Sequence, residues 1–586
     1  MTDRHRADPV AAAWTKMIKI DKTILLAASA FALALLVLPF YDNGMREVNA
    51  NERVRAYLTM ALVEDGTGML DRQVEAYGLP LDRAEKDGRV YCDKAPGVSF
   101  LAVPVYATIY LTGARSPFYL LVYFFRIAAV GVPVALMLIC MVGLLRQCVR
   151  EEIALAATAT YFLGTIALPL SSVFFGHQAA AAFCFMAYYF LRMGSDHRSV
   201  SASALAGLLA ATGVVIEFPT AMIAVGLFCL VLADRGLRRA APAFIAGFVA
   251  PLALLLWYNG CTFGNALDFG YAHTEHYFRL LGLNATGPLA ALEMPSWRTL
   301  WELACSSYRG LFFFSPVLLA AIWGLYELYA RGKRAESVVI ASLLVAYFTF
   351  NASMRDWAGG WSPGPRHLAP VIPFMALPLA LTAQRIVDMR AGAWKAVSGA
   401  CICGAAYVSV LVQLAVMTTY LYFPWDVYHP LRDVCLVFLS GGAFACTLPS
   451  LFGAPDYIGI AVFIGGAAVF LWAFCRGAFK LLAPSKAVRL GAVLFLAIWL
   501  CAISALPTSR TLSGDKFLAL IYWNSGRYGH FLDASRRIIE ASGSRDEKLR
   551  YAKQSIYAAY EIMKEPERAL WFYEAYESLG GARGES

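Results

Sequence analysis

Charged residues are scarce in this sequence, and their scarcity excludes an ordinary soluble protein. Asp, Glu, Lys and Arg make up 16% of the 586 residues, whereas hydrophobic residues make up 59%. A soluble domain carries about 25% charged residues. Because the deficit recurs along most of the length, the composition predicts a polytopic membrane protein. The apolar runs are nearly continuous and lack the period-two alternation of barrel strands, so the spans are expected to be helices.

Several motifs of soluble enzymes and pumps are also missing. The sequence has no Walker A motif, no G-x-G-x-x-G before a strand, no H-E-x-x-H and no C-x-x-C. ATP-driven transport, dinucleotide chemistry and zinc hydrolysis therefore lack sequence support. The net charge of +9 does not indicate nucleic-acid binding. Lys and Arg stand in short clusters between apolar runs, which is the pattern of cytoplasmic loops.

The thirteen cysteines carry little information. Most of them lie inside apolar segments, where cysteine packs as a small hydrophobic residue. Cys401 and Cys403 are separated by one residue, which is the wrong spacing for a redox or zinc motif. One alternative stays open, a disulfide among the four cysteines of the predicted outer loops, Cys92, Cys261, Cys305 and Cys435.

The alternation of apolar runs and basic clusters predicts an all-α, polytopic membrane helix bundle with about 13 transmembrane helices. A cytoplasmic segment, 1–22, precedes a first span at about 23–40, and later spans are expected at about 153–173 and about 311–330, among others. A large, polar extracytoplasmic loop follows at 41–97. The apolar run 99–112 is short for a span and predicts an interfacial helix. The transmembrane domain as a whole is expected to cover 23–506.

Beyond the last predicted span, 507–586 regains charged residues and tyrosines. Two stretches with helical periodicity, Ala519–Ile539 and Lys548–Leu579, predict a small C-terminal helical domain on the outer side. The spacing of alanine and aromatic residues resembles a tetratricopeptide repeat. A simple helical cap and a module that docks a protein partner both stay open.

The first loop carries two acids close to the end of the first span, Asp42 and Glu52. A carboxylate at the membrane surface can act as the general base that takes a proton from an acceptor hydroxyl. In the alternative interpretation, Glu52 only favours the N-terminus of a helix that Asn49 or Asn51 caps.

The first loop closes with a second polar cluster, Asp93 and Lys94 before Pro96-Gly97. Lys94 can bind a phosphate at the level of the lipid headgroups as a point charge. The alternative is a local ion pair beside a Pro-Gly turn.

The later loop 355–367 combines two tryptophans with Arg366 and His367. Arg366 can hold a phosphate bidentately, and Trp361 suits either a sugar-stacking platform or an interfacial aromatic belt. Weaker candidates stand at span ends or in another outer loop: His177, Glu217 and His273. An acid such as Glu217 between two apolar segments is expensive, which favours a function, although a hydrogen bond to the neighbouring turn also explains it.

Taken in order, four motifs resemble the GT-C membrane glycosyltransferases: Asp93–Gly97, Phe175-Gly176-His177, Glu217-x-Pro219 and Gly359–Arg366. The family includes protein O-mannosyltransferases, oligosaccharyltransferase catalytic subunits and aminoarabinose lipid A transferases. The resemblance covers roughly 20–510. It implies transfer of a sugar from a polyprenyl-phosphate carrier to an acceptor, a glycan, lipid or protein, at the outer face of the membrane.

By matched position, the resemblance makes Glu52 the base, and Lys94 and Arg366 the groups that neutralise the leaving phosphate. His177 stands where many members have a second-loop acid. Metal-dependent members rely on acids at such positions, so no metal ligands and no certain cofactor are expected, and a divalent ion stays an open alternative. The implied location is the bacterial inner membrane, with the site facing the periplasm.

Two other classes compete with a glycosyltransferase. A transporter or flippase of a lipid-linked glycan would show internal repeats and charges at mid-membrane, and Arg126 and Glu217 are the only such hints. A non-catalytic assembly protein would dock a partner through the C-terminal helices. The expected partners are the bilayer and a polyprenyl-phosphate-linked sugar, with no nucleic acid.

Overall fold

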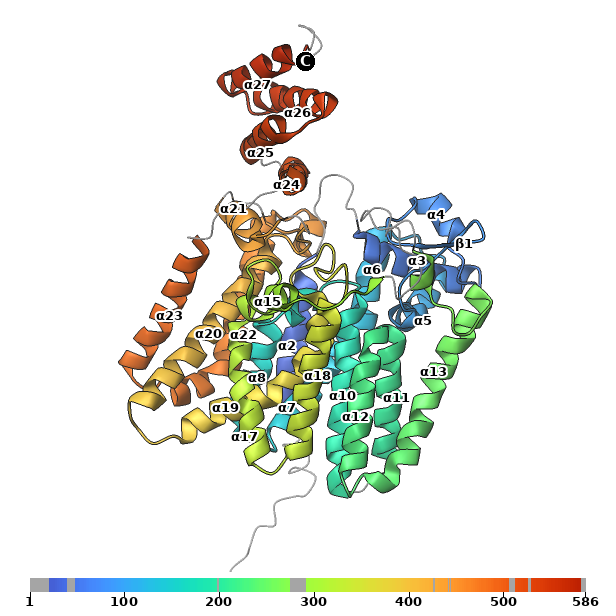
Figure 1. Ribbon diagram of the computed structural model, residues 1–586, viewed down its shortest axis with the longest axis vertical. Helices are drawn as coiled ribbons and strands as arrows, with labels where there is room; N and C mark the ends of the chain where they lie inside the picture. Colours follow the sequence, from blue (N-terminus) through green and yellow to red (C-terminus); the bar gives the residue numbers. More distant parts are fainter. Residues whose placement is uncertain are drawn as a thin grey trace, which may run out of the picture.

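The computed structural model describes residues 21–38, 48–197, 200–274, 291–424, 427–440, 442, 444–504, 512–524 and 528–580. Nearly all of the regular structure is helical, and the described residues hold a single two-stranded sheet. Figure 1 shows long helices running side by side as a bundle, with shorter elements gathered at one end. We call this the loop-bearing end, defined by the helices α3 (Ala50–Glu64), α4 (Asp71–Tyr77) and the strand β1 (Ala84–Lys86).

The long helices make a polytopic membrane bundle, as predicted. Among the described residues, seven helical segments are long and apolar enough to cross a bilayer. They include the helices α6 to α7, α13, α18, η7 to α19, α20, α22 and α23, which span Phe118–Leu145, Arg238–Phe263, Arg334–Ala352, Arg366–Asp388, Ala393–Thr418, Asp456–Leu482 and Lys486–Ile503. Shorter apolar helices accompany them, among which are α2 (Lys22–Leu36), α11 (Val200–Ile216), α12 (Ala221–Ala233) and α17 (Leu319–Ala330).

Two predicted spans are broken where the sequence suggested continuous helices. The span expected at 153–173 divides into α8 (Glu151–Leu163) and α9 (Ala167–Ser171), and α10 (Gly176–His197) follows. The span expected at 311–330 begins with the short helices α16 (Leu311–Phe314) and η6 (Pro316–Leu318) before α17. Broken backbone inside a membrane needs internal partners. At the second break, side chains of α20 supply them: Ser409 Oγ accepts from Val317 N at 3.1 Å, and Gln413 donates to the Phe314 carbonyl at 3.1 Å. At the first break, Thr165 Oγ1 accepts from Ala167 N at 3.2 Å and donates to the Tyr161 carbonyl at 2.7 Å.

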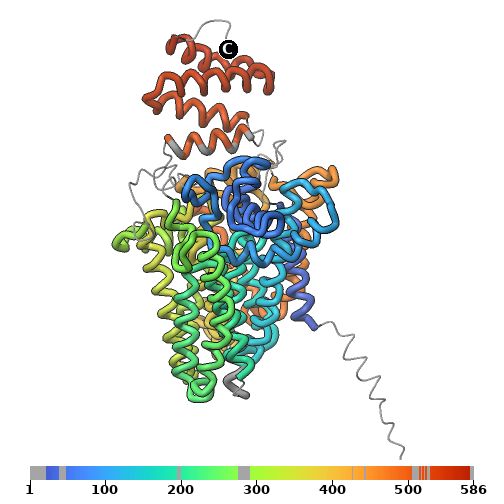
Figure 2. Tube along the Cα trace, turned by 90° about the vertical axis from the view of Figure 1, so that its right-hand side faces the viewer, coloured from blue at the N-terminus to red at the C-terminus, as the bar shows by residue number. Residues whose placement is uncertain are grey.

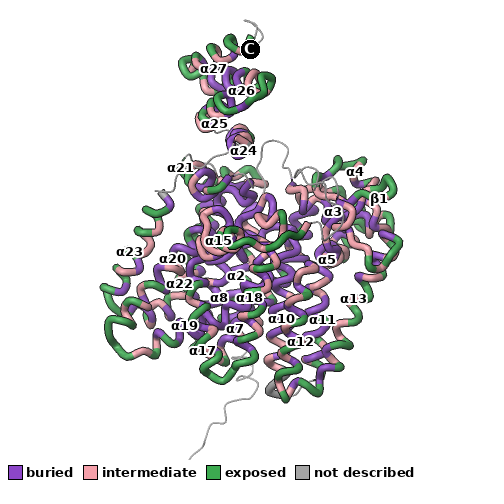
Figure 3. Tube along the Cα trace, in the orientation of Figure 1, coloured by how far each residue is buried: buried purple, intermediate pink, exposed green. Residues whose placement is uncertain are grey.

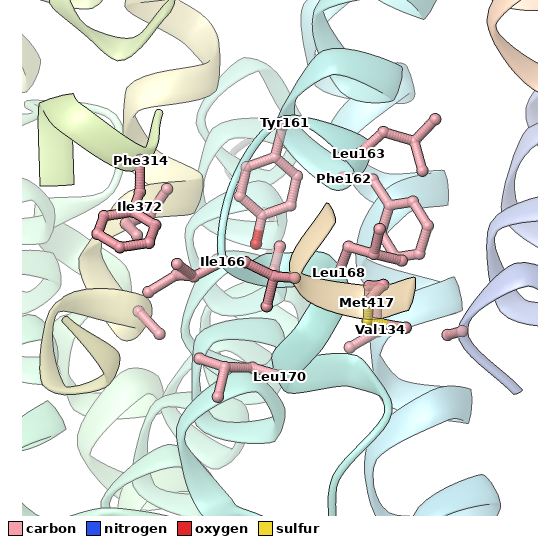
Figure 4. Packing of buried hydrophobic residues seen from close by; sticks show 14 of the residues in the cluster. Val134, Tyr161, Phe162, Leu163, Ile166, Leu168, Leu170, Phe314, Ile372 and Met417 are labelled. Carbon is pink, nitrogen blue, oxygen red and sulfur yellow. The ribbon is translucent and has the colours of Figure 1, made fainter. Parts of the chain in front are cut away.

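The packed interior lies at the centre of the bundle. Figure 3 shows buried segments concentrated there and exposed ones at the periphery and in the outlying helices. Figure 4 shows the packing around the break between α8 and α9, where Phe162, Ile166 and Leu168 interleave with Phe314 and Met417 from later helices. The broken span therefore lies in the core of the protein, away from lipid.

The first loop folds into a small cap on the loop-bearing end. Strand β1 pairs antiparallel with β2 (Arg89–Tyr91), in the register Ala84 opposite Tyr91. The next helix, α5 (Gly97–Leu111), packs on α3, and Figure 1 places it at the same end of the bundle. This is the segment that the sequence predicted to be interfacial.

Basic residues hold the opposite end of the bundle together. Arg146 contacts Asp21 before α2 at 3.3 Å, Arg331 donates to the Cys148 carbonyl at 3.3 Å, and Arg385 lies 3.5 Å from Glu327. These contacts join helix ends that are far apart in sequence.

Four helices form the C-terminal part: α24 (Leu512–Asn524), α25 (Tyr528–Ala541), α26 (Arg545–Tyr557) with η10 (Ala558–Ile562), and α27 (Pro566–Ser578). Figure 2 shows them stacked beyond the loop-bearing end. Tyr522 of α24 donates to the Asp433 carbonyl at 2.7 Å and packs on Phe438, where η8 (Leu431–Leu436) and α21 (Val437–Ser440) lie. All thirteen cysteines are free thiols, so the disulfide left open by the sequence is not formed.

A glycine contact between α11 and α13 gives a test of the bundle. A Cβ atom at Gly207 would lie 1.9 Å from the Phe244 carbonyl oxygen, and one at Gly247 would lie 1.9 Å from that of Ala204. We expect Gly207→Ala to force these helices apart and to lower the free energy of unfolding by about 1–3 kcal/mol. The measurement is the melting temperature of the purified protein in detergent.

The matched control is Gly465→Ala in α22, where nothing lies within 4 Å of the added Cβ. Alanine favours a helix over glycine by roughly 1 kcal/mol, so this variant should melt at or above the wild-type temperature. Equal melting temperatures for the two variants would contradict the close packing of α11 on α13.

Candidate functional site

Lys94 lies at the centre of a charge cluster on the loop-bearing end. Its ammonium nitrogen is 2.7 Å from Asp93 Oδ2 and 3.1 Å from Asp82 Oδ2. The ring of Tyr271 lies 5.8 Å away on another side. Close backbone packing fixes this segment, because a Cβ atom at Gly270 would lie 2.4 Å from the Cys92 carbonyl oxygen. The position of Lys94 is therefore set by two packed segments, the loop after β2 and the short helix η4 (Gly270–His273).

The two carboxylates beside Lys94 have opposite electrostatic environments. Burial raises the pKa of Asp82, but Lys94, Arg366 and a hydrogen bond from Asn51 outweigh it, so the net shift is downward. Burial also raises the pKa of Asp93, and the negative charge of Asp82 adds to it, so the net shift is upward despite Lys94. Such a divergence between neighbouring carboxyl groups is typical of acid–base sites. One oxygen of Asp93, Oδ1, is buried and has no hydrogen-bond partner among the residues that the structure describes.

A second ion pair, between Arg55 of α3 and Glu217 after α11, lies next to the Lys94 segment. Arg55 donates to Glu217 Oε1 at 3.0 Å and to the Ala95 carbonyl at 3.2 Å. His177 Nδ1 lies 3.4 Å from the same Glu217 oxygen. Gly176 is required here, since a Cβ atom would lie 2.3 Å from Glu217 Oε1. Arg55 thus ties the Lys94 segment to Glu217, and two of the predicted candidates, His177 and Glu217, meet.

The later loop brings Arg366 and His367 to the same place. The Arg366 guanidinium lies over the Phe175 ring at 5.3 Å, and the His367 ring is edge-on to that of His177 at 5.1 Å. The positive charges of Lys94, Arg55 and Arg366 all act on Glu217. Arg366 Nε and His367 Nε2 are buried atoms without a hydrogen-bond partner among the described residues. Unsatisfied buried donors of this kind call for a ligand or an explanation.

Arg309 holds this loop in shape. It is fully buried, and it donates to the carbonyls of Ala358 at 3.1 Å, Gly360 at 3.1 Å and Phe423 at 2.8 Å. Gly359 and Gly360 both have positive φ angles, 71° and 59°, which residues other than glycine rarely adopt. A Cβ atom at Gly359 would also lie 3.0 Å from the His367 ring. The glycine pair and Arg309 together set the direction of Arg366 and His367.

Glu52 lies deeper than a base for an external acceptor should. Its side chain is fully buried, and Arg126 of α6 holds both of its oxygens at 2.8 and 2.9 Å. The Phe174 amide donates to Oε1 at 2.6 Å, and the Tyr422 hydroxyl donates to Oε2 at 2.9 Å. With four donors on two oxygens, this carboxylate is occupied in holding the protein together. The geometry therefore corrects the expectation that Glu52 faces the acceptor.

The remaining predicted residues are scattered. Asp42 lies outside the described residues. Trp361 is half-buried and packs against the core. His273 Nε2 lies 2.9 Å from Asp268, and Asp268 also contacts Lys86 of β1 at 3.0 Å. Asp268 therefore links the first-loop cap to η4.

Sequence reasoning missed three residues of the site. Arg55 is one helical turn after Glu52 in α3, and its position could have been read from that spacing. Asp82 stands in an irregular stretch before β1 and carries no local signal. Arg309 is revealed only by its backbone partners, which are distant in sequence.

The residues around Lys94 do not fit a divalent ion. Asp82 and Asp93 already flank an ammonium group. Across the described part of the chain, no group of three His, Cys, Asp or Glu side chains is placed to hold a metal. The arrangement is instead suited to an anion, because cationic donors from three segments converge on it.

No protein-family model matches this chain, and no curated protein matches it significantly. Among solved structures it is similar to arabinosyltransferase EmbB from Mycobacterium smegmatis, at 12% identity over 86% of this chain and 42% of EmbB, with a TM-score of 0.41. The chain thus spans less than half of EmbB.

It is also similar to ArnT from Cupriavidus metallidurans in two states. The apo structure gives 14% identity over 91% of this chain and 81% of ArnT, with a TM-score of 0.37. The undecaprenyl phosphate complex gives 15% identity over 95% and 89%, with a TM-score of 0.38. Both proteins are members of the GT-C superfamily that the sequence resembles.

The buried pair of Glu52 and Arg126 gives a test of its structural role. Glu52→Ala would leave the Arg126 charge buried and unpaired, so we expect a loss of about 3–5 kcal/mol in the free energy of unfolding. The double variant Glu52→Leu, Arg126→Met removes both charges and should recover most of that loss. Melting temperatures in detergent measure both effects. A single variant as stable as the wild type would show that the pair does not hold the site together.

Proposed function

We propose that this protein is a membrane glycosyltransferase that moves a sugar from a polyprenyl-phosphate carrier to an acceptor at the loop-bearing end. The observation that carries the proposal is the convergence of Lys94 and Arg366. Lys94 and Arg366 belong to loops that are far apart in the sequence, yet the positive charges of both act on the carboxylates of Asp82 and Glu217. A phosphate at this place would meet an ammonium and a guanidinium at the level where the helices end.

The chemistry of a lipid-phosphate sugar fits this arrangement. Negative charge grows on the phosphate as the glycosyl–phosphate bond breaks, and fixed cations act most strongly at that moment. Arg366 suits two phosphate oxygens at once because its guanidinium is a planar fork. Lys94 supplies a compact charge from the opposite loop. His367 and Trp361 lie on the Arg366 side, where we place the donor.

The proposed sidedness follows from the basic residues. Arg146, Arg331 and Arg385 make their contacts at the end opposite the loops. Cytoplasmic loops of membrane proteins carry an excess of Lys and Arg. We therefore assign the loop-bearing end, with the first-loop cap and the C-terminal helices, to the outer face of a bacterial inner membrane.

In this proposal Glu52 and Arg126 act by positioning. Glu52 fixes α3 against α6 and the outer loops, and Arg55 of the same helix reaches the Lys94 segment. His177 and Glu217 complete the charge balance beneath the donor. The acceptor approaches from the water side of the first-loop cap.

Binding of undecaprenyl phosphate to purified protein tests the proposed phosphate site. A hydrogen bond to a charged group contributes about 1.5–3 kcal/mol, so Lys94→Gln or Arg366→Gln should weaken binding roughly 10–150-fold. Arg72→Gln is the matched control, because Arg72 is an exposed first-loop cation that pairs with Asp65 at 2.7 Å. Its affinity should equal that of the wild type. Equal affinities for all the variants would contradict the site.

Release of undecaprenyl phosphate from a panel of undecaprenyl-phosphate sugars separates the candidate functions. A transferase breaks the glycosyl–phosphate bond, so the wild type should release the free lipid phosphate when membrane extract supplies acceptors. A flippase or an assembly protein would leave that bond intact.

A further inference from the structure

Lys94 lies between two carboxylates, Asp93 and Asp82. The inference drawn from this pair rests on the proposed function, in which Lys94 binds the donor phosphate. The two partners differ in exposure. The Asp93 side chain is 6% exposed, and it adjoins Lys94 in the chain. The Asp82 side chain is 17% exposed and comes from the irregular stretch between α4 and β1. Of the two, Asp82 is the one that a group arriving from water can reach.

A phosphate on Lys94 would compete directly with Asp82. Both are anions that need the same ammonium group, which is already 3.1 Å from the Asp82 carboxylate. Asp93 is held in place by its buried backbone, against which Gly270 packs. Among the described residues, the Asp82 side chain is held by Lys94 and by a hydrogen bond from Asn51, and the charge of Arg366 also acts on it. Donor binding would therefore exchange one anion for another at Lys94 and release the Asp82 carboxylate.

The released group would be ready to accept a proton. The net pKa shift of Asp82 is downward, so it is ionised at neutral pH while Lys94 and Arg366 hold it. Once a phosphate takes over part of that positive charge, the same carboxylate becomes more basic, because nearby positive charge is what holds its pKa down. Asp82 lies 3.1 Å from Lys94, so a donor phosphate bound to Lys94 would place its sugar close to this carboxylate.

We propose that Asp82 is the general base of the transfer, and that binding of the donor phosphate to Lys94 releases it for this role. In the step itself, Asp82 takes the proton of the acceptor hydroxyl, and the acceptor oxygen forms a bond to the anomeric carbon. The bond between that carbon and the phosphate oxygen breaks, and its electron pair stays on the phosphate. Lys94 and Arg366 face the extra negative charge of the product. The donor therefore has to bind before the acceptor can be activated.

The test uses three full-length variants and two measurements. Asp82→Asn removes the base and also removes the anion that competes for Lys94. Asp82→Glu keeps a carboxylate at the same place. Asp65→Asn is the matched control, since Asp65 is a first-loop acid with a lowered pKa in an ion pair with Arg72 at the surface. The probes are undecaprenyl phosphate for binding and the panel of undecaprenyl-phosphate sugars, with membrane extract, for turnover.

We expect Asp82→Asn to bind undecaprenyl phosphate at least as tightly as the wild type, and to lose turnover by at least 100-fold, within the range of general-base catalysis. Asp82→Glu should recover part of the turnover, and Asp65→Asn should match the wild type in both measurements. A purely structural Asp82 would not produce tight binding together with lost turnover.

Two results would overturn the inference alone. If Asp82→Asn keeps turnover within threefold of the wild type, Asp82 is not the base. If it loses both binding and turnover, Asp82 only supports the phosphate site. A wild-type protein that binds no undecaprenyl phosphate, or that turns over no sugar of the panel, contradicts the proposed function itself, so the two failures are distinguishable.

Discussion

The buried ion pair between Glu52 and Arg126 is the interaction on which the rest of the site depends. Charges inside a membrane bundle are tolerated only when they are paired and hydrogen-bonded. Arg126 lies in a helix of the bundle, and Glu52 lies in the first-loop cap. Their two-point contact, completed by Phe174 and Tyr422, joins the cap to three other parts of the protein. The cap is therefore a fixed part of the bundle and not a loose insert.

From this pair the charges alternate outward to the surface. One turn along α3 from Glu52, Arg55 pairs with Glu217, and beyond it Lys94 sits between Asp82 and Asp93. On the neighbouring loop, Arg366 Nε and His367 Nε2 are buried, and neither has a hydrogen-bond partner within the described part of the chain. That loop is where an anion would complete the balance. In the proposed function, the phosphate of the donor is this anion.

The sequence predicted the helical membrane bundle because hydropathy and basic clusters report directly on the bilayer. It also drew attention to Lys94, Glu217, His177 and Arg366, since polar residues are conspicuous at the ends of apolar runs, and the structure brings these four together. It misplaced Glu52, because whether an acid faces water or a buried arginine depends on Arg126, which is 74 residues away. The break at 315 was missed for a related reason, because side chains of α20 satisfy its backbone groups and no local pattern reveals them. The break at 164–166 is supported locally by Thr165, whose hydroxyl accepts from Ala167 N and donates to the Tyr161 carbonyl.

The positions of the Glu52 partners in the sequence determine when each contact can form during synthesis. Arg126 is made soon after Glu52, but Tyr422 follows it by 370 residues. At about 5–20 residues per second of synthesis, roughly 20 to 75 seconds separate the two. During that interval the first-loop cap has been synthesised, while Tyr422 is not yet part of the chain. The last of the four donors to Glu52 therefore becomes available only after most of the chain has been synthesised.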